Sequence, residues 1–221
     1  MPGVLVIRQS DHSHREIAEL FREIRSYQVP NSQPTALELA AASIRKSLDR
    51  RITTEFNDTP LADAISQLAT QNEIRTVIDN AALADEGIST DEPLNLRVKG
   101  ISLRSTLRLA LRRHQLKAVI DGEVLKITTT IKAEEMMVVK AYDVSDLIEP
   151  GEFKSLIKTV TTIIAPETWE SVGGRGTVGS VEVKASKDPA AGHVALLIVR
   201  QTQDVHKKIA ALFDDLRRAR Q

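Results

Sequence analysis

Apolar and polar positions alternate along the chain in blocks that predict short strands and amphipathic helices. Near the start, the apolar run VLVI at residues 4–7 is typical of a strand buried on both faces. After a polar turn, four apolar residues recur at the spacing i, i+3, i+4, i+7, which places them on one face of a helix. This stripe consists of Ile17, Leu20, Phe21 and Ile24. Residues 1–28 therefore predict a strand followed by a helix.

The same pattern returns 192 positions later without a gap. The stretch LVIRQSDHSHREIAELFREIR at residues 5–25 aligns with LIVRQTQDVHKKIAALFDDLR at residues 197–217, and nine of the twenty-one aligned residues are identical. Ser10 and Thr202 both fall where a helix N-cap would accept a backbone N–H. We expect residues 1–28 to be the second half of a repeat within a longer tandem array. The alternative is a stray strand and helix docked on their neighbour.

A linker and a connector helix are predicted between the first copy and the next folded segment. Two prolines interrupt the polar stretch at residues 26–35, which disfavours regular structure there. The following residues, 36–51, have high helix propensity. We expect a linker and helix over residues 29–51. The inward-facing residues would be Leu37, Ile44 and Leu48.

Residues 52–131 predict a small α+β domain with the element order β-α-β-β-α-β-β around one sheet. The expected elements are strands at 52–56, 76–79 and 94–100, a hairpin over 116–129 that turns at Asp121-Gly122, a helix that starts at Asp58-Thr59-Pro60, and a helix over 102–114. Thr59 and Pro60 fit the cap and the first position of the first helix. The expected buried stripes are Leu61, Ile65, Leu68 and Ala69 in one helix, and Leu103, Leu107, Ala110 and Leu111 in the other.

Residues 132–221 predict a second α+β domain with the order β-α-β-β-α. The expected strands cover residues 136–148, 179–186 and 194–202, and the expected helices cover 153–165 and 204–218. The first of these helices would bury Leu156, Val160, Ile163 and Ile164. The chain as a whole is therefore expected to be α+β, with a partial repeat of strand and helix at its N-terminus.

Composition excludes several classes of function. Thirty basic residues balance thirty acidic ones and aromatic residues make up only 3%, so no nucleic-acid partner is expected. The chain has no cysteine, which excludes disulfides, thiolate zinc sites and cysteine nucleophiles. No apolar run is long enough to span a bilayer, so no direct membrane insertion is expected. The start does not resemble a signal peptide. Either the protein is cytoplasmic or its export signal lies outside this chain.

Two motifs could carry chemistry, and both favour a structural interpretation. GRGTVG at residues 174–179 fits G-x-G-x-x-G, but it lies between a predicted helix and a predicted strand, which is the wrong context for nucleotide binding. We expect a flexible glycine loop before an edge strand, with Trp169 packed beneath it. His12 and His14 could bind zinc, but the sequence places no further ligand nearby. Because His14 matches His206 in the second copy, packing or hydrogen bonding is favoured.

We expect no catalytic, cofactor-binding or metal-binding residues in this chain, and no cofactor. The candidate site is instead a cationic helix face. Arg104, Arg108 and Arg112 are spaced i, i+4, i+8, which aligns them on one side of the predicted helix 102–114. This face is a candidate partner-binding surface. A solvated helix face without a partner is the alternative.

The middle segment resembles the short N-terminal domain shared by secretins and TonB-dependent receptors. The resemblance covers about residues 52–129, from FNDTPLADAISQLATQNEIRTVID to LNLRVKGISLRSTLRLALRRHQLKAVIDGEVLKITT. Nearly all matched positions are core positions, so the resemblance supports fold better than activity. The matched positions are Phe56, Leu61, Ile65, Leu68, Val98, Leu103, Leu107, Leu111, Leu116, Val124 and Ile127.

The last segment resembles the ring-building repeat domains of secretin periplasmic regions. The stretch YDVSDLI at residues 142–148 and the strand-helix from Leu197 through His206 and Ile209 carry this resemblance. The insert TIIAPETWESVGGRG departs from it and is more similar to exported planctomycete-type envelope proteins that carry the same modules.

Together these resemblances imply a non-catalytic scaffold region of a secretin-like protein in the periplasm or cell envelope. Its task would be protein secretion or envelope assembly, by binding protein partners or by self-assembly into rings at the outer membrane. The first alternative is a periplasmic signalling domain that relays receptor occupancy to a regulator. The second, less favoured, is a nucleotide- or metal-dependent enzyme.

Overall fold

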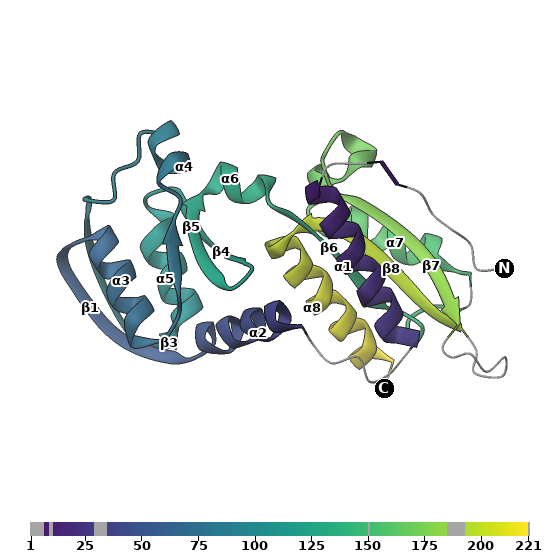
Figure 1. Cartoon of the computed structure of the whole chain (residues 1–221). Helices are drawn as coiled ribbons and strands as arrows, with labels where there is room; N and C mark the ends of the chain where they lie inside the picture. The colour runs from purple at the N-terminus through teal and green to yellow at the C-terminus, as the bar shows by residue number, and fades with distance from the viewer. Residues whose placement is uncertain (1–6, 9–10, 29–34, 150, 185–192, 221) are drawn as a thin grey trace. The chain divides into compact units, whose positions relative to one another are not determined.

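The structure is a computed structural model that describes residues 7–8, 11–28, 35–149, 151–184 and 193–220. The chain forms two compact units (Figure 1). The inserted domain comprises Gln33–Glu135, and the split domain joins Met1–Ser32 to Met136–Gln221. The half-repeat thus belongs to the same unit as its copy, although the inserted domain separates the two in sequence.

The inserted domain has the predicted order of strands and helices, with three additional helices. Its elements are α2 (Ala36–Leu48), β1 (Arg51–Pro60), α3 (Leu61–Gln71), β2 (Thr76–Ile78), α4 (Asn80–Asp85), β3 (Pro93–Ser102), α5 (Leu103–Arg112), β4 (Leu116–Asp121), β5 (Val124–Thr129) and α6 (Thr130–Glu135). The expectation of helix α2 is confirmed, whereas α4 and α6, of six residues each, had no periodic signal in the sequence.

The expectation of one sheet in this domain is wrong, because its strands form two sheets. β1 pairs with β3 in an antiparallel two-stranded sheet, and β5 lies between β2 and β4 in a three-stranded sheet. Alternation of apolar residues marks where strands lie but does not specify their partners. The irregularities in the β1–β3 pairing, between Ile52 and Thr53 and between Phe56 and Thr59, are the kind that bend a strand away from a flat sheet.

Both predicted helix stripes of the inserted domain are buried in its core. Leu61, Leu68, Leu103 and Leu111 are each at most 1% exposed. The predicted cap of α3 is wrong: Pro60 itself occupies the N-cap position without a side-chain hydrogen bond, and Thr59 still belongs to β1. The strand continues this far because Thr59 and Pro60 pair with Leu94 and Pro93 of β3.

Helix α2 is part of the core of the inserted domain. Thr35 and Glu38 form a capping box at its start, and Ile44 and Leu48 join the apolar cluster formed by α3 and α5. Leu37 was expected to face inward but is 48% exposed. It lies in the first turn of the helix, where the described core no longer reaches it.

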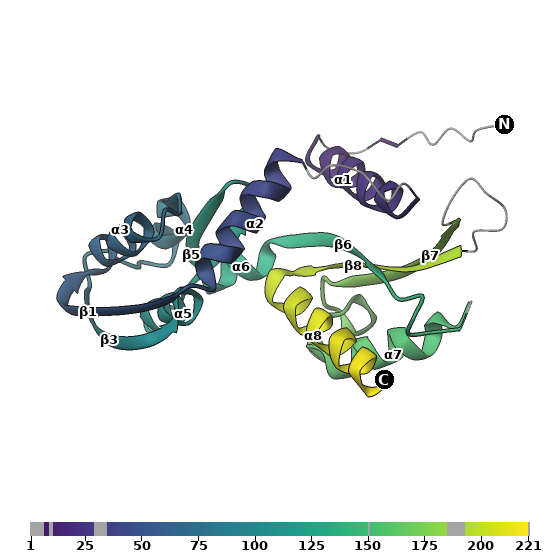
Figure 2. The same cartoon turned by 90° about the horizontal axis from the view of Figure 1, so that it is seen from below.

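The split domain is built on the antiparallel sheet β6–β8–β7. Its elements are α1 (Asp11–Gln28), β6 (Met137–Asp143), α7 (Phe153–Ile163), η1 (Pro166–Thr168), η2 (Glu170–Val172), β7 (Thr177–Lys184), β8 (His193–Thr202) and α8 (Gln203–Ala219). The predicted order β-α-β-β-α is confirmed for β6 through α8. Figure 2 shows α7 and α8 on one face of the sheet and α1 on the other.

The predicted opening strand is only partly within the described residues. Residues 4–6 and the predicted cap Ser10 lie outside them, and Ile7 and Arg8 are not in a strand. The predicted cap Thr202 is confirmed, because its side chain accepts a hydrogen bond from the backbone N–H of Val205. One buried position was wrong: Ile163 is 62% exposed. It ends α7, just before Ala165 adopts a left-handed backbone conformation with φ 44° and redirects the chain.

Candidate interaction surfaces

The predicted arginine face lies on α5, the most strongly amphipathic helix of the inserted domain. Ser102 caps the helix by accepting a hydrogen bond from the N–H of Ser105, and the side that carries Leu103, Leu107 and Leu111 is buried. The i, i+4, i+8 spacing therefore turns Arg104, Arg108 and Arg112 outward. The sequence predicted this geometry correctly, and whether the face binds a partner remains a prediction.

Arg104 differs from the other two arginines because it has a partner within the domain. Its Nε and Nη2 atoms donate to Oδ1 of Asp49 at 3.1 and 2.9 Å. Asp49 is the C-cap residue of α2, so the ion pair joins the two helices. The Arg104 side chain is 36% exposed and that of Asp49 67%. A pair this exposed typically contributes about 0.2–1 kcal/mol, and it fixes the position of Arg104.

Arg108 and Arg112 remain as the exposed cationic pair of α5. Within the described part of the chain, neither forms an ion pair. Leu109, which sequence reasoning assigned no role, is 45% exposed beside them. Two such arginines beside an exposed leucine are typical of a protein-binding surface. The guanidinium groups supply directional hydrogen bonds and the leucine supplies apolar contact area. The sequence could have indicated that Leu109 is exposed, because this residue falls outside the predicted buried stripe of its helix.

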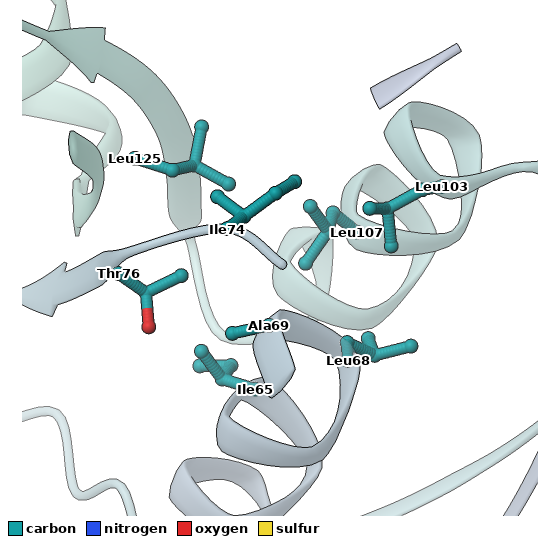
Figure 3. Close-up of a pocket in the computed structure, with 8 residues that line it drawn as sticks. All are labelled: Ile65, Leu68, Ala69, Ile74, Thr76, Leu103, Leu107 and Leu125. Atoms are coloured by element: carbon teal, nitrogen blue, oxygen red, sulfur yellow. The ribbon is translucent and has the colours of Figure 1, made fainter. Parts of the chain in front are cut away.

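A small apolar cavity lies between α3, α5, β2 and β5 in the core of the same domain (Figure 3). It is lined by Ile65, Leu68, Ala69, Ile74, Thr76, Leu103, Leu107 and Leu125. The cavity volume is about 10 Å³, room for about one water-sized sphere, whereas small-molecule sites measure roughly 300–1,000 Å³. This cavity is therefore a packing gap rather than a ligand site.

The GRGTVG motif forms a tight loop around Trp169 in the split domain. Trp169 is 1% exposed, and its indole N–H donates to the carbonyl oxygen of Ile164 at 2.7 Å. The backbone N–H of Gly174 donates to the carbonyl of Trp169, and that of Gly176 donates to the carbonyl of Thr168. The expectation of Trp169 as a packing anchor is confirmed. The expectation of a flexible loop is wrong, because hydrogen bonds hold both glycines.

Close packing, rather than a phosphate-binding role, explains why two positions of the motif are glycine. A Cβ atom on Gly174 would overlap the backbone carbonyl of Thr168, and one on Gly176 would overlap the side-chain amide of Gln201. Gln201 is fully buried and donates from Nε2 to the hydroxyl of Thr168 at 2.8 Å. The predicted edge strand β7 follows the loop. This arrangement does not form the strand-loop-helix that a dinucleotide phosphate needs.

The two matching histidines have different environments. His206 is 2% exposed, and burial lowers its pKa to about 4. Its imidazole joins β6 to α8 through the hydroxyl of Tyr142 and the carbonyl of Val138. The predicted structural role is confirmed for His206, whereas His14 is exposed on α1. The side chain of His12 lies outside the described residues. Among described residues, no three His, Asp or Glu side chains gather as a metal site.

No protein-family model matches the sequence, and no curated protein matches it as a relative. Among the solved structures that it resembles is the GspC–GspD complex from the type II secretion system of enterotoxigenic Escherichia coli. That match has 16% identity and a TM-score of 0.28, and covers 75% of this chain and 98% of that chain.

Two further solved structures have the same TM-score of 0.28. XcpQN012 is 15% identical over 76% of this chain and 65% of that chain. InvGN0N1 in the Salmonella SPI-1 injectisome, refined with SpaPQR and PrgHK, is 10% identical over 75% of this chain and 93% of that chain. Likeness at this level transfers neither a site nor an activity to this chain. None of the described helices is both long and apolar enough to cross a membrane.

Proposed function

We propose that this chain is a non-catalytic protein–protein interaction module of a secretin-like cell-envelope protein, acting in protein secretion or envelope assembly. Its place would be the periplasm, and its partners would be other proteins or further copies of itself. The sequence resemblance of residues 52–129, 142–148 and 197–209 to secretin modules supports this assignment.

The observation that carries the proposal is the exposed α5 face formed by Arg108, Leu109 and Arg112. A folded domain holds this face in place through the buried side of the helix, so binding requires little ordering of its backbone. Cations at the rim of an interface favour encounter with an acidic surface and reject basic ones. An acidic protein surface with an apolar centre is the partner that matches this chemistry.

The split domain exposes carboxylates and apolar side chains together in one loop, so a second copy of the chain is the partner we favour. Ile163 and Val172 are 62% and 64% exposed at either end of the Trp169 loop. Glu167 and Glu170 are exposed in the same loop. The loop is fixed by the hydrogen bonds of Trp169 and Gln201 and therefore presents its carboxylates from a rigid support. We propose that the α5 face of one copy contacts this loop of the next copy.

Light scattering combined with size exclusion tests self-assembly over a concentration series. The wild-type chain is expected to gain mass with concentration and to lose that gain at high salt, because salt screens exposed charges. Arg108→Glu with Arg112→Glu is expected to keep the chain monomeric. Adding Glu167→Arg and Glu170→Arg to that variant reverses both sides of the contact and should restore association.

A matched control is Arg75→Glu with Arg97→Glu, which reverses two cations whose side chains are each 82% exposed elsewhere in the inserted domain. This control should associate like the wild type. A wild-type chain that is strictly monomeric at its highest soluble concentration contradicts self-assembly. Equal loss of association in the control and in the α5 variant contradicts the assigned face.

A further inference from the structure

Helices α1 and α8 are two copies of one sequence pattern, and they lie on opposite faces of the same sheet (Figure 2). α1 contacts β6 and β7, and α8 contacts β8. The aligned stripe residues are Ile17 with Ile209, Leu20 with Leu212, Phe21 with Phe213, and Ile24 with Leu216. One pattern therefore serves both as the core helix of this domain and as a cover on the opposite face of its sheet.

The face of the sheet that α1 covers is apolar. Leu197 and Val199 of β8 belong to the core beneath α7 and α8, so the alternating residues Leu196 and Ile198 point to the other face. Strand pairing adds Ala141 opposite Ile198 and Val181 opposite Leu196. Leu196 is fully buried although it lies outside the main core cluster. We call these four residues, Ala141, Val181, Leu196 and Ile198, the outer face.

The stripe of α1 is buried less completely than the stripe of α8. Ile17, Leu20 and Ile24 are half-buried, whereas the other described side chains of the helix are exposed. The clearest difference lies between equivalent phenylalanines, since Phe21 is 37% exposed and Phe213 is 1% exposed. A helix with this pattern therefore packs on the outer face, but its apolar stripe is not fully buried there.

The connection of α1 to the sheet also differs from that of α8. α8 follows β8 directly in the chain, whereas the whole inserted domain, Gln33–Glu135, separates α1 from β6. Among the described residues, no strand or turn next to α1 in sequence joins it to the sheet that it covers. Its hold on the outer face depends on noncovalent contacts across a half-buried stripe.

From these observations we propose that the outer face is a docking surface for an amphipathic helix, that α1 is its in-chain occupant, and that a partner helix with the same apolar stripe displaces α1. The partner is an amphipathic helix with large apolar residues at i, i+3, i+4 and i+7, because that is the pattern seated on the face. Exchange is required rather than simple opening, since an uncovered outer face would expose a contiguous apolar patch. This proposal extends the scaffold function to a second surface and does not involve the α5 arginines.

The test uses the full chain and a fluorescently labelled peptide of residues 11–28 as the probe, followed by anisotropy. Leu20→Asp with Ile24→Asp in the chain should release α1, because both substitutions place carboxylates in the stripe. The matched control, Ala18→Asp with Arg22→Asp, places two carboxylates on the exposed side of the same helix. The release variant is expected to bind the peptide about tenfold or more tightly than the wild type. This difference corresponds to a wild type in which α1 occupies the outer face at least about nine-tenths of the time, because the peptide binds only molecules whose outer face is free.

Three further arms separate the proposal from its alternatives. The control should bind the peptide like the wild type, and a peptide that itself carries Leu20→Asp and Ile24→Asp should not bind. Val181→Lys on the edge strand β7 should weaken peptide binding to the release variant. Arg108→Glu with Arg112→Glu should leave peptide binding unchanged, so failure of the proposed α5 contact and failure of this proposal are distinguishable.

Equal peptide affinity for the wild type and the release variant overturns the proposal. So does loss of the buried Trp169 fluorescence signal in the release variant, because α1 would then be a permanent part of the domain. Binding of the stripe-disrupted peptide with the same affinity as the normal peptide also overturns it.

Discussion

The hydroxyl of Tyr142 lies 2.8 Å from Nδ1 of His206, and Nε2 of the same imidazole lies 2.9 Å from the carbonyl oxygen of Val138. A carbonyl only accepts hydrogen bonds, so Nε2 carries the proton and Nδ1 accepts from the tyrosine hydroxyl. This neutral imidazole connects both ends of β6 to α8. The Tyr142 ring also packs edge-on against Phe213, with ring centroids 5.4 Å apart.

Replacing Tyr142 by Phe should destabilise the split domain by about 1–3 kcal/mol, because it leaves the buried Nδ1 of His206 without its donor. The aromatic contact with Phe213 is retained, so the change isolates the hydroxyl. Urea unfolding followed by the fluorescence of Trp169, the single tryptophan of the chain, measures the effect. A change below about 0.5 kcal/mol would show that the hydrogen bond contributes little.

The stability of the split domain should fall as the pH is lowered from 7 to 5. Burial lowers the pKa of His206 to about 4 from an ordinary value of 6.5, and the positive charge of Lys140 also lowers it. Between these two values the unfolded state binds more protons than the folded state, so stability is lost as pH falls. The expected loss from pH 7 to pH 5 is about 2 kcal/mol.

Urea unfolding of the same domain at pH 5, 6 and 7 checks this dependence. His206→Gln removes the titrating group and should flatten the profile. His14→Gln, at the exposed equivalent position of the repeat, is the matched control. An equally steep profile in His206→Gln would assign the pH dependence to another group.

Gly174→Ala should disrupt the Trp169 loop, since the new Cβ would overlap the backbone of Thr168. Overpacking against a fixed backbone typically costs about 1–3 kcal/mol, and near-ultraviolet circular dichroism of Trp169 should weaken. Gly179→Ala is the matched control in the same motif, because no atom lies within 4 Å of its added Cβ. Equal stability of the two variants would contradict the contact-based role of Gly174.

Nucleotides and divalent metals should leave the melting temperature of the chain unchanged. The glycine motif is engaged with Thr168 and Gln201, and the described apolar cavity is too small for a cofactor. A thermal-shift series with ATP, NAD, Mg²⁺ and Zn²⁺ checks this expectation. A dose-dependent rise with any one of them would revive the enzyme alternative, because a ligand stabilises the state that binds it.

The buried stripes of the helices could be predicted because side-chain burial follows the helical period wherever the turns before and after a residue also pack on the core. Leu61, Leu68, Leu103 and Leu111 satisfy this condition and are buried as expected. Leu37 and Ile163 also match the period, but each lies in a terminal turn of its helix, and they are 48% and 62% exposed although Ile164 beside Ile163 is buried. Periodicity alone cannot detect that boundary.

Relationships between distant segments were less predictable. The division into two sheets, the cover formed by α1, and the contact between Gln201 and Thr168 depend on tertiary packing. For the candidate site, the spacing of Arg104, Arg108 and Arg112 was sufficient to align them. The sequence did not indicate that Asp49, 55 residues earlier, would engage Arg104 and leave the other two exposed.

Site-specific photocrosslinking at Leu109 tests the proposed protein-binding role most directly. A photoreactive phenylalanine analogue replaces Leu109 in the full-length protein in its own cells, and the same analogue at Val77 serves as control because both side chains are 45% exposed. We predict a protein adduct at Leu109, identified by mass spectrometry, that disappears when Arg108 and Arg112 become Glu. Equal adduct yields at Leu109 and Val77, or an adduct that survives the charge reversal, would contradict the account.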